Sequence, residues 1–260
     1  AGPAQEWLDA VAALTVQLDA LEDALPDNDW VTVASAFPRQ EIGLGLNQDA
    51  ARPELVELNS LDLPTTGTLE VWVQFERTQA QTSFDASTAT SPFRLVLDSA
   101  QVLRLDITNL AGETITVAID LSDWPPEVDS QIHHLVVTWQ TTPTTVLSLQ
   151  LDDAVVYATA ASGSGLPPLS PLALGLSQAG DIPYTGRFHQ LRLWDHQRSQ
   201  SQLQAAQRAD LVGDEAGLLV YVPLDDGEGT RLNNLAASAA LYAKVPPTPQ
   251  ESPQWVEADW

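Results

Sequence analysis

The sequence predicts an all-β protein built as a two-sheet antiparallel sandwich, with an amphipathic helix before it and one short helix near residues 199–209. Three observations lead to this prediction. Apolar residues recur at helical spacing near the start of the chain, and from residue 30 onward they alternate with polar ones. Turn residues separate the alternating segments at short intervals. Many short strands rich in Thr and Val are typical of a sandwich, because each strand buries one face against the opposite sheet.

Residues 1–29 are expected to form the N-terminal helix and a polar break. The apolar side chains lie three or four residues apart, and so on one stripe of a helix: Trp7, Val11, Leu14, Leu18, Leu21 and Leu25. Pro26 ends the pattern. The stripe fits either a coiled-coil seam, which would join subunits through residues 5–25, or a helix that packs on its own chain. We favour the second because the flanking positions offer no complementary charge pairs and three heptads are marginal.

Residues 30–260 are expected to form the sandwich. The alternating segments are residues 68–75, 93–97, 114–119, 135–139, 146–151 and 154–157. Turn signals stand between them, among them Gly112, Pro143 and the pair Asp152 and Asp153. One helical segment interrupts the strands, and Ser199 and Ser201 are suited to begin it.

Composition excludes several classes of function. Against 35 Asp and Glu there are 11 Lys and Arg, which gives a net charge of −24. Such a surface repels phosphate backbones and anionic headgroups, so we expect neither nucleic-acid nor membrane partners. No apolar stretch is long enough to span a bilayer. Cysteine is absent, which excludes disulfides and thiolate catalysis. Methionine is absent too, so we expect the start of the chain to be processed or to be the edge of a larger protein.

Several segments, taken in order, resemble a known family. Residues 61–73 and residues 132–139 (Ile-His-His-Leu-Val-Val-Thr-Trp) are similar to two of its strands. Residues 185–199, with Gly186, Trp194 and Ser199, are followed by a short helix and by the acidic turn at 225–230. Together they resemble the laminin-G-like, concanavalin A-like jelly-roll domains of bacterial proteins. His189 and Gln190 stand where that family carries Asp and Glu.

The resemblance implies a jelly-roll fold and a binding or adhesion function, with carbohydrate as the leading ligand class. It implies an extracellular or cell-surface location. Relatives hold glycans at loop rims, and many bind calcium. The departure at His189 and Gln190 marks one place where the family's pattern is not carried over.

An enzyme on this sandwich would place two carboxylates on one strand face. Glu70 and Glu76 are six residues apart, too far for a retaining pair at a rise of about 3.3 Å per residue. We therefore predict no enzyme and assign no catalytic residue. Glu70 is interpreted as a strand residue held by local hydrogen bonds. His133 and His134 are adjacent, so their rings point to opposite faces and cannot share an ion. We expect them to begin a strand and to pack beside Trp139.

Calcium is the expected cofactor, if there is one. Its candidate ligands lie on turns that contain glycine: Asp181, Asp225, Asp226 and Glu228. The alternative, which we favour, is that these residues only shape turns and need no ion.

Ligand binding is expected from aromatic side chains on loops. Trp124 and Tyr184 are the candidates, whereas Trp72, Trp139 and Trp194 fall on strands and should fill the core. The function predicted is a non-catalytic module that recognises a carbohydrate or another cell-surface ligand through its loops. The alternative is an assembly subunit that contacts other proteins through the N-terminal helix and the sheet edges.

Overall fold

The chain divides into two units, Ala1–Gln40 and Glu41–Trp260. The computed structural model describes residues of the second unit only. These are residues 41–46, 56–58, 62–75, 77, 80–85, 93–125, 129, 131–159, 165–167, 172–175, 184–207, 209–224, 231–232, 234–236, 243–244 and 254–258. The helix expected within residues 1–29 lies outside them. Within the described residues, no helix combines the length and the apolar character needed to cross a bilayer.

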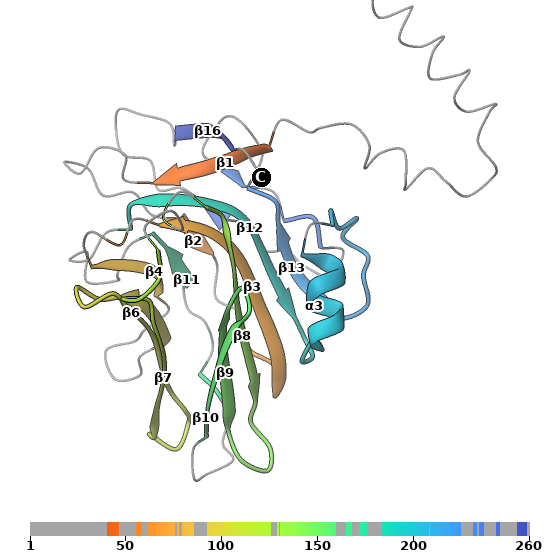
Figure 1. Ribbon diagram of the computed structural model, residues 1–260. Coiled ribbons are helices and arrows are strands. Elements are labelled where there is room, and N and C mark those ends of the chain that lie inside the picture. Colours follow the sequence, from red (N-terminus) through yellow and green to blue (C-terminus); the bar gives the residue numbers. More distant parts are fainter. Residues whose placement is uncertain are drawn as a thin grey trace, which may run out of the picture. The chain divides into compact units, whose positions relative to one another are not determined.

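The described chain folds into two antiparallel sheets (Figure 1). Sheet A has the strand order β10 (Ala154–Thr159), β9 (Val146–Leu151), β8 (His133–Gln140), β3 (Thr66–Phe75), β12 (Gly186–Trp194), β1 (Glu41–Leu46) and β16 (Gln254–Ala258), and β13 (Leu218–Val222) also pairs with β12. Sheet B has the order β14 (Arg231–Leu232), β15 (Ala243–Lys244), β2 (Val56–Leu58), β11 (Leu172–Leu174), β4 (Gln81–Asp85), β5 (Phe93–Leu97), β6 (Val102–Thr108) and β7 (Thr114–Asp120).

The core lies between the two sheets and follows from the alternation of side chains. In β7, Ile115, Val117 and Ile119 are buried, while Thr114, Thr116, Ala118 and Asp120 are exposed. In β3 the same rule sends Leu69, Val71, Val73 and Phe75 into the core and leaves Glu70 and Trp72 on the outward face. The two-sheet antiparallel sandwich predicted from the period of two is confirmed.

The strands follow the predicted segments closely at their centres and extend them at the ends. The segment expected at 135–139 begins two residues earlier, with His133, and the segment expected at 154–157 runs on to Thr159. Strands β1 and β6 add to the predicted set. Boundaries shift because a partner strand can hydrogen-bond residues beyond the alternating pattern.

The short helix predicted near 199–209 is α3 (Gln200–Ala206), with Ser199 as its N-cap. Ser199 and Gln202 form a capping box: the Gln202 amide donates to the Ser199 hydroxyl, and the Ser199 amide donates to Gln202 Oε1. The helix lies beside β12 and β13 (Figure 1). It is therefore placed over the outward side of sheet A.

Candidate functional site

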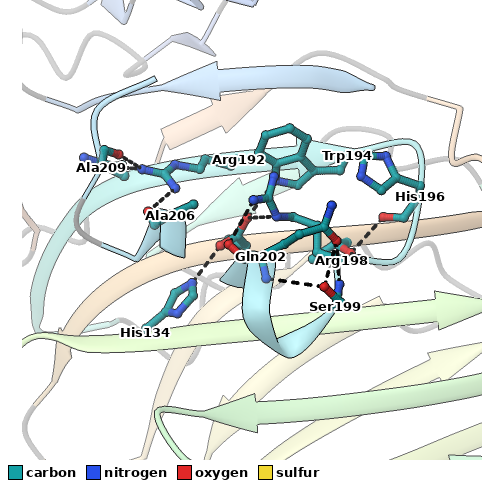
Figure 2. Close-up of polar contacts among 12 residues, drawn as sticks. His134, Arg192, Trp194, His196, Arg198, Ser199, Gln202, Ala206 and Ala209 are labelled. Atoms are coloured by element: carbon teal, nitrogen blue, oxygen red, sulfur yellow. Dashed lines mark hydrogen bonds and ion pairs between the residues drawn. The ribbon is translucent and has the colours of Figure 1, made fainter. Parts of the chain in front are cut away.

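The outward face of sheet A carries a buried carboxylate. Glu70 lies in β3 and is fully buried. Trp194 donates its indole N–H to one oxygen at 2.7 Å, and His134 Nε2 lies 2.9 Å from the other (Figure 2). Because an ionised carboxylate only accepts hydrogen bonds, His134 Nε2 is the donor. Arg198 Nε completes the arrangement at 3.7 Å.

Cross-strand register explains why these side chains meet. Arg192 of β12 stands opposite Glu70, and His134 of β8 stands opposite Trp72. Side chains at such positions point to the same face of the sheet. The Trp72 ring stacks on the His134 ring with centroids 4.3 Å apart, and the Arg192 guanidinium lies 4.3 Å from the Trp72 centroid. We call Glu70, His134, Arg192, Trp194 and Arg198 the Glu70 cluster.

Electrostatics keep Glu70 ionised. Burial raises the pKa of Glu70, but the hydrogen bond and charge of His134, together with the charges of Arg192 and Arg198, outweigh it. The net result is a pKa below the ordinary value of 4.5. At neutral pH the cluster therefore holds a buried negative charge matched by neighbouring cations.

The Glu70 cluster also fixes α3. Arg192 donates from Nη1 to the carbonyl of Ala206 at 2.8 Å and from Nη2 to the carbonyl of Ala209 at 2.5 Å (Figure 2). These bonds tie the last residue of the helix and the segment that follows it to the sheet. At the other end, Arg198 lies 3.9 Å above the Trp194 ring and donates to the carbonyl of Gln202 at 3.0 Å.

The Glu70 carboxylate is closed off from solvent. Glu70 and Arg192 have no exposed surface, and Trp194 and His134 have 2–3%. A substrate cannot reach the carboxylate, and its oxygens are already bonded. Glu76 lies outside the described residues. The prediction that Glu70 is held by hydrogen bonds is confirmed, but the bonds are not local, because its partners are 64 and 124 residues away in sequence.

The paired histidines begin β8 and point to opposite faces, as predicted. His133 Nδ1 lies 2.6 Å from Asp152 Oδ2, and the His133 ring stacks on Phe75. His134 faces outward into the Glu70 cluster. Their expected packing beside Trp139 is wrong, because the two rings lie against Phe75 and Trp72 instead. In the described part of the chain, no three His, Asp or Glu side chains gather to hold a metal ion.

His189, at the departure from the family pattern, is buried in β12. Burial and the neighbouring Arg187 lower the pKa of His189 from 6.5 to about 4. Its neighbour Gln190 accepts a hydrogen bond from Arg192 Nη2 at 2.5 Å. These two residues therefore serve the packing of sheet A.

Trp124 lies in the loop that follows β7, where the sequence places it. Its ring is half-buried against the core, and its centroid is 6.0 Å from that of His133. His133 is in turn bonded to Asp152, whose carboxylate is 35% exposed in the turn between β9 and β10. The loop and this turn thus bring a partly exposed indole and a partly exposed carboxylate next to the same buried imidazole.

The Trp124 loop is anchored by Arg77, a nearly buried side chain. Arg77 donates from Nη1 to the carbonyls of Leu121 and Trp124 and from Nη2 to that of Pro125, at 2.6, 3.2 and 3.0 Å. Its Nε lies 2.5 Å from Asp129. One guanidinium therefore holds three loop carbonyls and a carboxylate, which fixes the backbone of the loop that carries Trp124.

The four candidate calcium ligands, Asp181, Asp225, Asp226 and Glu228, all lie outside the described residues. Their roles remain predictions from the sequence.

The comparisons with known proteins agree with this fold. The family model of the concanavalin A-like lectin/glucanases superfamily, of the laminin G type, matches residues 50–204. The chain belongs to this superfamily. Its sandwich is accordingly of the jelly-roll type that the sequence resemblance implied. Among curated proteins, no sequence matches this chain.

The first of two similar solved structures supports the fold. A proposed carbohydrate binding protein from Bacteroides ovatus matches with a TM-score of 0.58 and 15% identity, over 85% of this chain and 60% of that one. A heptameric SAP-like pentraxin from Limulus polyphemus gives a TM-score of 0.49 and 12% identity, over 81% and 97%. The chain therefore spans less than two thirds of the Bacteroides protein, and at 15% identity the likeness is one of fold.

Tyr184 has a different place in this concanavalin A-like sandwich from the one expected. Its ring is fully buried beside Phe188, and its hydroxyl donates to the carbonyl of Gln74 at 2.6 Å. Burial raises the pKa of Tyr184 well above 10. The expectation of an exposed loop aromatic is wrong, because the residue stands just before β12 and packs inward, where the Gln74 carbonyl accepts a hydrogen bond from its hydroxyl.

The concanavalin A-like sandwich also exposes an aromatic residue that sequence reasoning did not select. This residue is Tyr157 of β10, whose side chain is 71% exposed. It points outward because its neighbours Val156 and Ala158 pack on the core. The alternation of inward and outward side chains within residues 154–159 predicts that Tyr157 points outward. What the sequence could not show is that β10 ends its sheet.

Proposed function

We propose that this protein is a non-catalytic binding module that recognises a carbohydrate or another cell-surface ligand, outside the cell or on its surface. The observation that carries the proposal is Trp124, a partly exposed indole on a loop already fixed by Arg77. An aromatic ring that is held in place costs little conformational entropy on binding and can cover the apolar face of a sugar.

The surroundings of Trp124 favour a neutral ligand. Ser122 and Asp123 are exposed in the same loop, and Asp152 and Asp153 stand in the neighbouring turn. Hydroxyl and carboxylate oxygens accept hydrogen bonds from sugar hydroxyls. The acidic character of this end of the sandwich, within a chain of net charge −24, opposes sulfated and carboxylated ligands.

The absence of catalysis is supported by the Glu70 cluster. A glycosidase of this architecture needs a carboxyl group that reaches the sugar. Glu70 is instead enclosed and bonded to Trp194 and His134. Its burial beneath α3 gives it a structural role.

The proposal is tested by binding of neutral glycans to the full chain, first on an array and then by calorimetry with the strongest hit. Trp124→Ala should weaken binding at least tenfold, whereas Tyr157→Ala, which removes an exposed aromatic on the outward face of sheet A, should leave it unchanged. Thermal unfolding of both variants checks that they are folded. No glycan binding by the wild type, or equal binding by folded Trp124→Ala, would overturn the assignment.

The predicted calcium site has its own test. If Asp181, Asp225, Asp226 and Glu228 bind the ion, millimolar calcium should raise the melting temperature above that in chelator, because ligand binding stabilises the folded state. The double substitution Asp225→Asn and Asp226→Asn should abolish the difference. A melting temperature that calcium leaves unchanged would reduce these residues to turn formers.

A further inference from the structure

The indole of Trp124 is supported separately from the loop that carries it. Arg77 donates to carbonyls, so it acts on the backbone of the loop and not on the torsion angles of the side chain. The indole centroid lies 6.0 Å from the centroid of His133, and the two ring planes are tilted by 58°. At this separation two aromatic rings in a tilted arrangement attract each other. His133 is therefore a support for the indole itself.

His133 is fixed in its turn by a stacking contact and a hydrogen bond. Its imidazole stacks on Phe75 of β3 with ring centroids 5.3 Å apart. Its Nδ1 lies 2.6 Å from Asp152 Oδ2. Because a carboxylate at neutral pH only accepts hydrogen bonds, Nδ1 is the donor. This bond sets both the orientation of the ring and the nitrogen that carries the proton.

Asp152, in the turn between β9 and β10, is constrained along its backbone as well as at its carboxylate. Its φ of 51° lies in the left-handed region, which Asp and Asn enter more readily than most residues. Its amide donates to the carbonyl of His134 at 2.9 Å, and its Oδ1 accepts from the His134 amide at 2.9 Å. Its carbonyl accepts from Gln150 Nε2 at 2.6 Å. The turn therefore presents the carboxylate to His133 in one orientation.

We propose that Asp152 is a positioning residue of the Trp124 site, which acts through His133 to hold the indole in the orientation that binds the ligand. This role rests on the proposed function and adds to it a link between a turn of sheet A and the loop that follows sheet B. Arg77 fixes the backbone of the loop, and Asp152 and His133 fix the ring. Without the pair the indole would sample other rotamers, and the cost of ordering it would oppose binding.

Two substitutions of Asp152 separate positioning from charge. Asp152→Gly removes the carboxylate, and glycine accepts the left-handed backbone without strain. Asp152→Asn removes the charge but keeps the shape: its Oδ1 can accept from the His134 amide, while its Nδ2 can donate to His133 Nδ1 in the other tautomer. The indole should therefore keep its position in the Asn variant and lose it in the Gly variant. Asp153→Asn is the matched control, because it removes the same charge from the exposed next residue.

Fluorine NMR of the full chain, labelled with fluorotryptophan, reports on the indole without any ligand. The resonance of Trp124 is the one that disappears in Trp124→Phe. In Asp152→Gly it should move toward the position of free fluorotryptophan, because the ring loses its fixed surroundings. In Asp152→Asn and Asp153→Asn it should stay in place. A cooperative thermal unfolding transition checks that each variant is folded.

Calorimetry with the neutral glycan that binds most strongly on the array measures the consequence for binding. Ordering one side chain weakens affinity by about threefold to tenfold. The dissociation constant should rise by that factor in Asp152→Gly and remain as in the wild type in Asp152→Asn and Asp153→Asn.

The positioning role and the proposed function fail in different ways. An unmoved Trp124 resonance in folded Asp152→Gly would overturn the positioning role. So would a loss of affinity in Asp152→Asn or Asp153→Asn as large as in Asp152→Gly. A wild type that binds no glycan, while the Trp124 resonance moves as expected, would overturn the proposed function alone.

Discussion

Replacing a single residue can destabilise this sandwich strongly, and Glu70 is the clearest case. Its charge is removed from water and offset by Trp194, His134, Arg192 and Arg198. A buried ion cluster of this kind contributes little compared with an apolar core of the same shape, but breaking it leaves charges without partners. Loss of Glu70 would therefore destabilise the fold and weaken the attachment of α3.

Replacing Glu70 by Gln should lower the free energy of unfolding by about 3 kcal/mol, because the Arg192 and Arg198 charges would remain buried without their counter-ion. Urea unfolding measures the loss. Asp106→Asn is the matched control, since the Asp106 pair with Arg104 is partly exposed and should be worth less than about 1 kcal/mol. A loss in Glu70→Gln no greater than in Asp106→Asn would contradict the cluster's role.

His189 should make stability depend on pH. Its pKa is lowered to about 4 in the folded chain, whereas an unfolded histidine titrates near 6.5. The unfolded state therefore binds more protons between these values, so stability is complete above pH 6.5 and falls as the pH drops toward 4. The urea midpoint should therefore decrease between pH 7 and 4.5.

His189→Gln provides the comparison for this pH dependence. The variant should show a flatter midpoint between pH 7 and 4.5, because glutamine does not titrate. An equal slope in the wild type and in folded His189→Gln would assign the dependence to other groups.

At the scale of elements, α3 shows how a sheet can hold a helix that would not form by itself. Seven residues are too few for an isolated helix in water. The capping box of Ser199 and Gln202 provides hydrogen bonds to backbone amides at the start of the helix. At the other end, Arg192 donates to the carbonyls of Ala206 and Ala209. Leu203 and Ala206 bury the inner face. The stability of α3 thus depends on its contacts with sheet A.

Arg192→Lys should loosen α3 without unfolding the strands. An ammonium on a flexible stem cannot bridge the carbonyls of Ala206 and Ala209 as the planar guanidinium does. Hydrogen exchange should become at least tenfold faster within residues 200–206, while exchange in β5 and β6 stays unchanged. Gln204→Ala, at an exposed position of the same helix, should leave exchange as in the wild type. Unaltered protection in Arg192→Lys would exclude the anchoring role.

At the scale of the whole molecule, the net charge of −24 is a property of the surface. Among the described residues, burial removes cations and carboxylates in equal number: Arg77 and Arg192 are buried, and so are Glu70 and Asp85. Other acids of the described chain, such as Asp153 and Asp214, are exposed. Repulsion among surface carboxylates is therefore expected to act on the folded state.

Salt should stabilise this protein. Added NaCl screens repulsion among surface carboxylates, so the melting temperature at pH 7 should rise by several degrees between low and molar salt. At pH 4, where part of the carboxylates are protonated, the rise should be smaller. A melting temperature that does not change with salt at pH 7 would show that self-repulsion is unimportant.

The sequence predicted the sandwich well because burial of alternate side chains is a local property of each strand. It also predicted α3 from its cap, the strand positions of His133 and His134, and the burial of Trp72, Trp139 and Trp194. It failed for Tyr184, because a ring before a strand can turn outward or inward, and only the available space and the Gln74 carbonyl decide which.

What the sequence determined by itself was the two-sheet fold and the superfamily, since the period of the apolar residues and the order of the motifs are readable along one dimension. What only the tertiary structure decided was which distant side chains meet. The partners of Glu70 come from β8, β12 and the segment after β12. Arg77 hydrogen-bonds the loop that carries Trp124, and β10 lies at the end of its sheet. These depend on sheet order and register, and strand patterns alone do not specify which strands become neighbours.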